Sequence, residues 1–181
     1  GAEANAAFAA AYDQLVALGR QDTERAGTLL NNWGMLLGAL GRPREAEQML
    51  RRSIAVSIAG GSDARVDPIS WSNLARMVLD LGRYDEATAL AERAMRQARA
   101  RGDTVVADQA QLMAARANSA AGHAARAEAL LVSGDRAGAR KDFQVLGSRA
   151  VDDAERFTFL LREADCLESA ARAAAFLREH C

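Results

Sequence analysis

Two asparagines are the residues whose spacing most clearly indicates a recognition chemistry in this sequence. Asn32 and Asn73 stand at equivalent places in two similar stretches of the chain, 41 residues apart. A carboxamide both donates and accepts hydrogen bonds, so two of them at the same helical phase are suited to binding the backbone of an extended peptide. The same face is expected to carry four further residues: Asn31, Met35, Ser72 and Arg76. The alternative is that Asn32 and Asn73 only bridge neighbouring turns inside the protein.

The sequence shows no pattern typical of catalysis or of metal or phosphate binding. It contains no G-x-S-x-G, no G-x-x-x-x-G-K-[ST] and no G-x-G-x-x-G that opens a helix. Cys166 and Cys181 lack a C-x-x-C spacing, His123 stands alone, and His180 adjoins Cys181 at a terminus where fraying disfavours a metal pair. We therefore predict no catalytic residue, no metal ligand and no cofactor, and the chain is not expected to be an enzyme.

Charge and hydropathy disfavour nucleic acid and membranes as partners. The chain has 23 Lys and Arg against 24 Asp and Glu, a net charge of −1, so it has no domain-wide basic field that would attract phosphate. No apolar run reaches the roughly 18 residues of a spanning helix, and the first residues do not resemble a signal peptide. A basic stretch at Arg93, Arg96, Arg99 and Arg101 is interpreted as a solvated helix face. These properties predict a cytoplasmic protein.

An internal repeat indicates which elements position the asparagines. The stretches LGRPREA at residues 40–46 and LGRYDEA at residues 81–87 match at an offset of 41 residues. Apolar residues precede each stretch at intervals of three and four, the spacing of an amphipathic helix, and place Trp33 and Trp71 in the core. Each unit is therefore predicted to be a helix, a tight turn and a second helix.

Residues typical of helix ends and helix starts agree with that prediction. Gly41 and Gly82 stand where a left-handed residue ends a helix, and Pro43 stands at the start of the next one. Asp67 followed by Pro68 is a capping residue with proline at the first helical position.

This pattern resembles the tetratricopeptide repeat. The second unit matches the residue types that the repeat favours at eight positions: Trp71, Leu74, Ala75, Gly82, Tyr84, Glu86, Ala87 and Ala94. The first unit matches at four: Gly34, Gly41, Glu45 and Ala46. The 41-residue period exceeds the usual ~34 by about two helical turns, which together with asparagine in the first helix resembles the kinesin-light-chain variety of the repeat.

The resemblance implies an all-α fold, a right-handed α-solenoid of about four antiparallel helix pairs in a single array over residues 1–181. The best-defined units are residues 22–61 and 67–102, and the irregular units are residues 1–21 and 103–181. At the start, residues 4–19 align with the second helix of a unit whose first helix is absent, which predicts a fragment of a larger protein.

In the second irregular unit the sequence allows more than one assignment of helices. Residues 103–133 are either one long helix, the reading we prefer, or two helices broken at Gly122. Asp152 with Glu155 three residues later resembles a capping box, after which one or two closing helices are expected.

The function implied by the resemblance is a non-catalytic scaffold that holds a protein or peptide on the concave face lined by first helices. Arg76 on that face would favour an acidic ligand. A larger bacterial regulatory or signalling protein is the expected context, given the alanine- and arginine-rich composition. Two alternatives remain open: self-association through an uncapped end of the solenoid, and an accessory domain of an enzyme whose catalytic part lies elsewhere.

Overall fold

The structure is a computed structural model that describes residues 1–59, 63–149, 153–167 and 170–180, and this part of the chain forms helices and no strands. The elements in chain order are α1 (Ala2–Ala17), α2 (Glu24–Ala39), α3 (Pro43–Ala59), the short 3-10 helix η1 (Asp63–Arg65), α4 (Pro68–Asp80), α5 (Tyr84–Ala100), α6 (Thr104–Ser133), α7 (Arg136–Arg149), α8 (Asp153–Asp165) and α9 (Ala170–His180). The all-α prediction is confirmed.

The turns within the two helix pairs have the predicted geometry. Gly41 and Gly82 have φ of +71° and +74°, the left-handed region that a residue without Cβ adopts at least cost. After the first turn the Arg42 amide donates to the Leu37 carbonyl at 3.0 Å, which satisfies a helix-end carbonyl. The same bond follows Gly82. The chain therefore reverses within three residues, and the next helix runs antiparallel to the last.

Small residues set the distance between the paired helices α2 and α3. A Cβ atom on Gly34 would lie 2.7 Å from Cγ of Leu50 and 3.1 Å from the carbonyl oxygen of Ala46, so only glycine fits there. Ala46 and its counterpart in the second pair, Ala87, are 0% and 1% exposed. Both alanines are buried just past their turns, where the paired helices approach each other.

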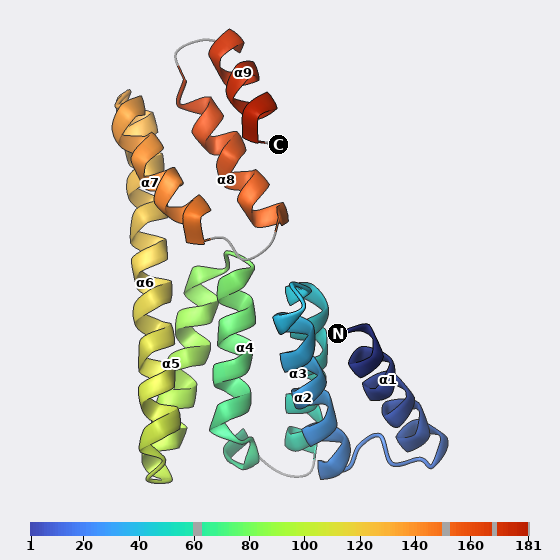
Figure 1. The fold of residues 1–181 in the computed structure, drawn as a ribbon. Helices are drawn as coiled ribbons and strands as arrows, with labels where there is room; N and C mark the ends of the chain where they lie inside the picture. Colours follow the sequence, from blue (N-terminus) through green and yellow to red (C-terminus); the bar gives the residue numbers. More distant parts are fainter. Residues whose placement is uncertain (60–62, 150–152, 168–169, 181) are drawn as a thin grey trace. The chain divides into compact units, whose positions relative to one another are not determined.

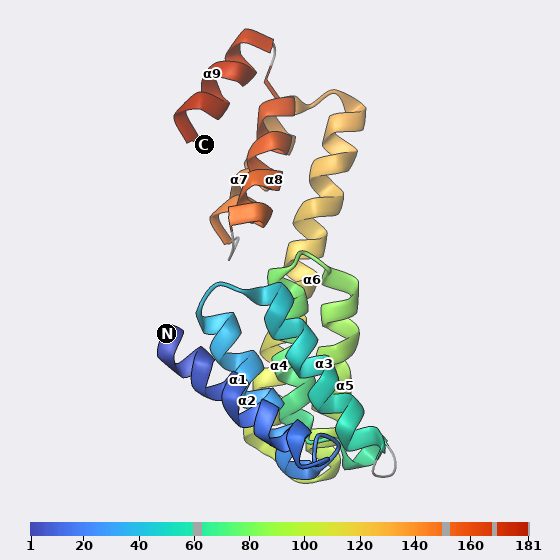
Figure 2. The same ribbon diagram turned by 90° about the vertical axis from the view of Figure 1, so that its right-hand side faces the viewer.

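The chain divides into two compact units, Gly1–Ala115 and Arg116–Cys181, with the boundary inside α6. In the first unit α1 packs on α2, α2 on α3, α3 on α4, and α4 on α5. The paired helices α2 and α3, and α4 and α5, lie side by side in both views (Figures 1 and 2). This is the consecutive helix packing of a solenoid of helix pairs.

The core of the first unit consists of aliphatic side chains from every helix pair. Leu30, Leu50 and Val78 have no exposed surface, and Trp71 is 5% exposed. Trp33 is only partly buried, packs on Tyr12 of α1, and donates its indole N–H to the side chain of Asn5 at 2.9 Å. Both tryptophans thus contribute to packing, as predicted.

The basic stretch of α5 does more than face solvent. Arg101 donates to the carbonyls of Ala64 and Val66, and Arg93 pairs with Asp63 while its guanidinium lies 4.0 Å from the Trp71 ring centroid. These contacts bind the segment between the two helix pairs to α5. Both arginines keep solvent-exposed surface, so the predicted solvated face also holds this segment in place.

The second unit begins within α6, which is one continuous helix of 30 residues through Gly122. A Cβ atom at Gly122 would meet no described atom within 4 Å, so the glycine is tolerated on an open helix surface. The preference for one long helix is confirmed. Further along, α7 packs on α8 and α8 on α9. The proposed capping box falls on Asp152 and Glu155 and lies outside the residues whose side chains are described.

Candidate functional site

The first helices of the two pairs, α2 and α4, meet along a polar seam. Asn73 donates from its side-chain amide to Oδ1 of Asn31 at 3.2 Å, and the amide of Asn31 in turn donates to Oδ1 of Asn32 at 3.4 Å. Asn73 is thus bonded to Asn31 and not to Asn32, its counterpart in the repeat. Successive residues on a helix point about 100° apart, so Asn31 and Asn32 face different directions. One amide bridge links the two repeats, and Asn32 is left at its exposed edge.

A second inter-repeat contact lies one turn further along both helices. Arg76 donates from Nη2 to the sulfur of Met35 at 3.2 Å. Its Nε is buried and has no hydrogen-bond partner in the part of the chain that the structure describes. An unsatisfied buried donor is unfavourable. The terminal N–H groups of this guanidinium that are not directed at Met35 can donate to an added acceptor.

The structure therefore brings together four of the six predicted site residues: Asn31, Met35, Asn73 and Arg76. We call the surface made by these four side chains of α2 and α4 the first-helix face. Asn32 lies at its edge. Ser72 is only 6% exposed, because it precedes Asn73 by one residue and points inward.

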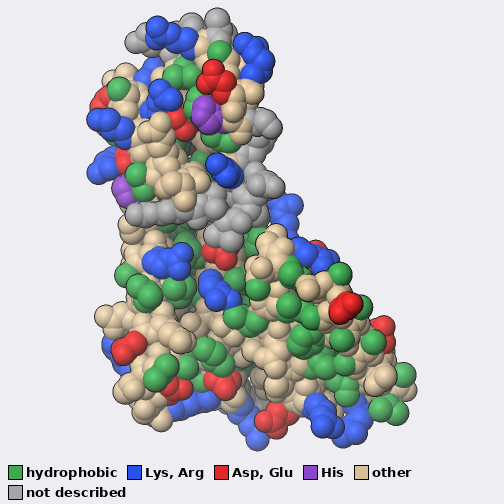
Figure 3. Space-filling view, in the orientation of Figure 1, with side chains coloured by type: hydrophobic (Ala, Val, Ile, Leu, Met, Phe, Trp, Pro, Cys, Tyr) green, Lys and Arg blue, Asp and Glu red, His purple; other side chains and the backbone are tan. Residues whose placement is uncertain are grey.

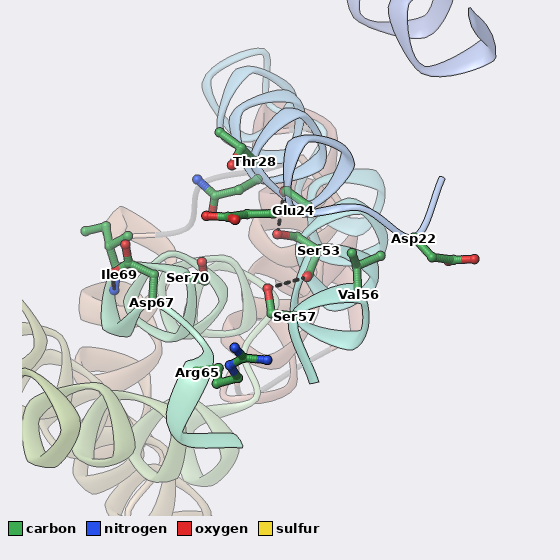
Figure 4. A pocket seen from close by; sticks show the side chains of 12 residues that line it. Asp22, Glu24, Thr28, Ser53, Val56, Ser57, Arg65, Asp67, Ile69 and Ser70 are labelled. Carbon is green, nitrogen blue, oxygen red and sulfur yellow. Dashed lines mark hydrogen bonds between the residues drawn. The ribbon is translucent and has the colours of Figure 1, made fainter. Parts of the chain in front are cut away.

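A polar cavity of about 580 Å³ adjoins the first-helix face at Asn31 (Figure 4). It lies between the beginnings of α2 and α4, and the C-terminal half of α3 forms its floor. The lining residues are Asp22, Glu24, Gly27, Thr28, Asn31, Ser53, Val56, Ser57, Arg65, Asp67, Ile69 and Ser70. Except for Asn31, sequence reasoning missed these residues.

Hydroxyl groups that line the cavity differ in their hydrogen bonding. Ser53 donates to the Gly27 carbonyl at 2.7 Å, and Ser57 donates to the Ser53 carbonyl at 3.1 Å. Ser70 is 8% exposed, and its hydroxyl forms no hydrogen bond with any described residue. Figure 4 shows this hydroxyl pointing into the cavity.

Thr23 and Asp67 cap the two helices that begin beside the cavity, so the carboxylate of Glu24 is not used as a cap. Thr23 accepts a hydrogen bond from the Ala26 amide at 3.4 Å, and Asp67 accepts one from the Ile69 amide at 3.1 Å. Glu24, in the first turn of α2, forms no ion pair with any described residue. Its carboxylate extends over the cavity in Figure 4.

The second helices α3 and α5 carry an ionic network of their own. Glu47 accepts hydrogen bonds from Arg51 at 2.8 Å and from Arg83 at 2.7 Å, and both arginines also pair with Glu86. Burial of Glu86 raises its pKa, but the hydrogen bonds from Arg51 and Arg83 outweigh it and lower the pKa overall. These groups satisfy one another across the repeat boundary, which gives the network a structural role.

Carboxylates are buried in the second unit. Asp142 of α7 is 2% exposed and accepts hydrogen bonds from Arg126 at 2.6 Å and, with His123 donating, at 2.9 Å. The hydrogen bonds from Arg126 dominate and lower the pKa of Asp142 to about 2. Glu163 of α8, 7% exposed, accepts from Arg140 at 2.9 Å and from Gln144 at 2.7 Å. Each carboxylate joins neighbouring helices.

Other kinds of site find little support in the described residues. No group of three or more His, Cys, Asp or Glu side chains among them is arranged to hold a metal ion. None of the described helices is both long and apolar enough to cross a membrane.

The fold and the first-helix face define a helical-repeat array, a class of protein built from stacked helix pairs. A family model described as "Tetratricopeptide repeat" matches residues 27–59 and 71–99. These segments correspond to α2 with α3 and to α4 with α5. The two matched segments are therefore tetratricopeptide repeats, and such repeats generally act as non-catalytic scaffolds for protein–protein interaction. No curated protein matches the chain in sequence.

Proposed function

We propose that this chain is a non-catalytic scaffold whose first-helix face holds an extended segment of a partner protein. The observation that carries the proposal is the pair of inter-repeat contacts, Asn31 with Asn73 and Met35 with Arg76, beside a polar cavity. An amide pair retains lone pairs and N–H groups after its mutual bond, and the Arg76 guanidinium has N–H donors beyond the one directed at Met35. A peptide backbone and an acidic side chain supply the missing partners.

The test begins with a selection of peptides from a random display library, with the 181-residue chain as bait. The affinity of a selected peptide is then measured for Asn31→Ala, Asn73→Ala and Arg76→Ala. Each substitution removes a polar contact, and we expect a loss of about 1–3 kcal/mol, roughly tenfold to a hundredfold in Kd. Binding should also weaken with salt, because part of it depends on the Arg76 charge.

Arg96→Ala is the matched control. Arg96 is 67% exposed on α5 and lies 3.6 Å from Glu92, away from the first-helix face. If the three variants of the first-helix face bind like the wild type while Arg96→Ala loses binding, the proposal is wrong.

A second candidate is self-association through α1. Val16 is 46% exposed and Leu18, just after α1, is 68% exposed, and Figure 3 shows hydrophobic side chains gathered over this helix. We propose that a second copy can cover this apolar surface, as stacking does between repeats in a solenoid. Light scattering across a concentration series tests it: mass should rise with concentration for the wild type and stay constant for a Val16→Asp, Leu18→Ser variant.

We also propose a reducing, cytoplasmic setting and a larger bacterial regulatory protein as the context. Cys166 supports the first point, because it is a buried thiol that donates to the Arg162 carbonyl at 3.3 Å, and burial raises its pKa. The alanine- and arginine-rich composition and the 41-residue period, similar to that of kinesin light chains, support the second. The full-length reading frame tests both.

A further inference from the structure

The cavity beside Asn31 is lined by a serine hydroxyl to which no described residue forms a hydrogen bond. Ser70 is more than nine-tenths buried, its hydroxyl lines the cavity and points into it, and no described residue bonds to it. The hydroxyl opens into the cavity, so it is available for a hydrogen bond with a ligand.

The remaining polar groups on the walls are mostly hydrogen-bond acceptors. The protons of Ser53 and Ser57 are committed to the carbonyls of Gly27 and Ser53, so these hydroxyl oxygens present lone pairs. The Glu24 carboxylate extends over the same space with no ion pair to a described residue. The walls are therefore complementary to a group rich in N–H donors.

The charged groups that line the cavity are mostly negative, which also favours a ligand with N–H donors. Three carboxylates line the cavity, those of Asp22, Glu24 and Asp67, against one guanidinium, that of Arg65. Asp22 is directed away from the cavity in Figure 4, and Asp67 caps α4, so Glu24 is the carboxylate most available to a ligand. The positive ends of α2 and α4 are already met by Thr23 and Asp67. A cation is therefore favoured over an anion.

We infer that this cavity takes a lysine or arginine side chain of the peptide bound on the first-helix face. The inference rests on the proposed function, which supplies the peptide, and it adds the chemistry of one side chain. Glu24 would pair with the cationic group, while Ser57 and Ser70 accept N–H bonds from it. The volume of about 580 Å³ leaves room for the residues on either side. Since Arg76 lies on the other side of the Asn31–Asn73 bridge, the bound segment carries a basic and an acidic residue at separate positions.

The experiment uses the display selection on the full chain, followed by titration of one selected peptide and of the same peptide with its basic residue replaced by glutamine. We expect Lys or Arg at one aligned position of the selected peptides. Glu24→Gln should weaken the basic peptide about tenfold and leave the glutamine peptide unchanged. Glu92→Gln, the same change at an exposed position of α5, should have no effect on either.

Ser70→Ala separates binding from folding. Because it removes a hydroxyl that bonds to no described residue of the protein, it should weaken the basic peptide about threefold to tenfold while the melting temperature changes little. Peptides selected without a basic position, or unchanged binding by Glu24→Gln and Ser70→Ala while Asn73→Ala and Arg76→Ala weaken it, would overturn the cavity assignment and leave the proposed function standing. Selection of no peptide would overturn both.

Discussion

The first compact unit has close helix crossings at small residues and the second has ion pairs at deeply buried carboxylates, although both are entirely helical where the structure describes them. In residues 1–115, helices cross at Gly34, Ala46 and Ala87 and close over aliphatic side chains without exposed surface. In residues 116–181, the buried carboxylates Asp142 and Glu163 join neighbouring helices. A small-residue crossing recurs at a fixed spacing and leaves a periodic signal in sequence, whereas an individual ion pair leaves none. Both matches of the family model accordingly fall in the first unit.

The largest effect is expected from a cavity in the first unit. Leu50 has no exposed surface and packs into the crossing at Gly34, so Leu50→Ala should lower the free energy of unfolding by about 2–5 kcal/mol. Urea denaturation followed by tryptophan fluorescence measures it, because Trp33 and Trp71 both belong to residues 1–115. Leu112→Ala is the control: Leu112 is 58% exposed and its loss should change stability little. Equal midpoints for the two variants would contradict the assigned core.

Overpacking the same kind of crossing should have the next largest effect. Ala87 is 1% exposed, and Ala87→Leu should destabilise the unit by about 1–3 kcal/mol because the helices must separate to admit the larger side chain. Ala100→Leu, at an exposed helix end, should cost little. Thermal melts measure both variants. Equal melting temperatures for Ala87→Leu and Ala100→Leu would show that α4 and α5 do not cross closely at Ala87.

Acid should affect the second unit through Asp142. Its pKa is lowered to about 2, below that of an unfolded aspartate, so the stabilisation is complete above about pH 4 and is lost as the pH falls toward 2. Asp142→Asn should remove about 1–2 kcal/mol at neutral pH, a modest value because Arg126 is 65% exposed and screened by solvent.

The measurement is circular dichroism melting between pH 7 and pH 2, because no tryptophan reports on this unit. Asp142→Asn should lose less stability than the wild type between pH 4 and pH 2. Identical pH profiles for the two proteins would show that the ion pair contributes nothing.

The smallest effects should have opposite signs at two glycines. Gly82 has φ of +74°, so Gly82→Ala should destabilise the first unit by about 1 kcal/mol. Gly122 lies inside α6 with open space around it, so Gly122→Ala should stabilise that helix by about 0.5–1 kcal/mol. Melting temperatures that move in the same direction for both variants would be inconsistent with these backbone assignments.

Much of the fold could be predicted because it depends on local rules. Gly41 and Gly82 end helices in the left-handed conformation, and Asp67 and Pro68 begin one. These features depend on a few neighbouring residues, so a sequence contains the information directly.

The site was less predictable because it depends on how helices rotate against each other. Spacing pairs Asn32 with Asn73, but the packed helices bring Asn31 to Asn73 instead, a shift of one residue that sequence period cannot fix. The same rotation buries Ser72. Ser70 carried no signal at all, since its role arises from a cavity formed by three separate helices.

The turns at Gly41 and Gly82 have a consequence for amide hydrogen exchange. A tight turn would ordinarily show as a fast-exchanging gap between two protected helices. Here the amides of Arg42 and Arg83 are bonded to carbonyls of the preceding helices at 3.0 Å and 3.1 Å, so protection should continue through each turn. Each helix pair should therefore exchange as a single cooperative block, with its borders between pairs and not between the helices of a pair.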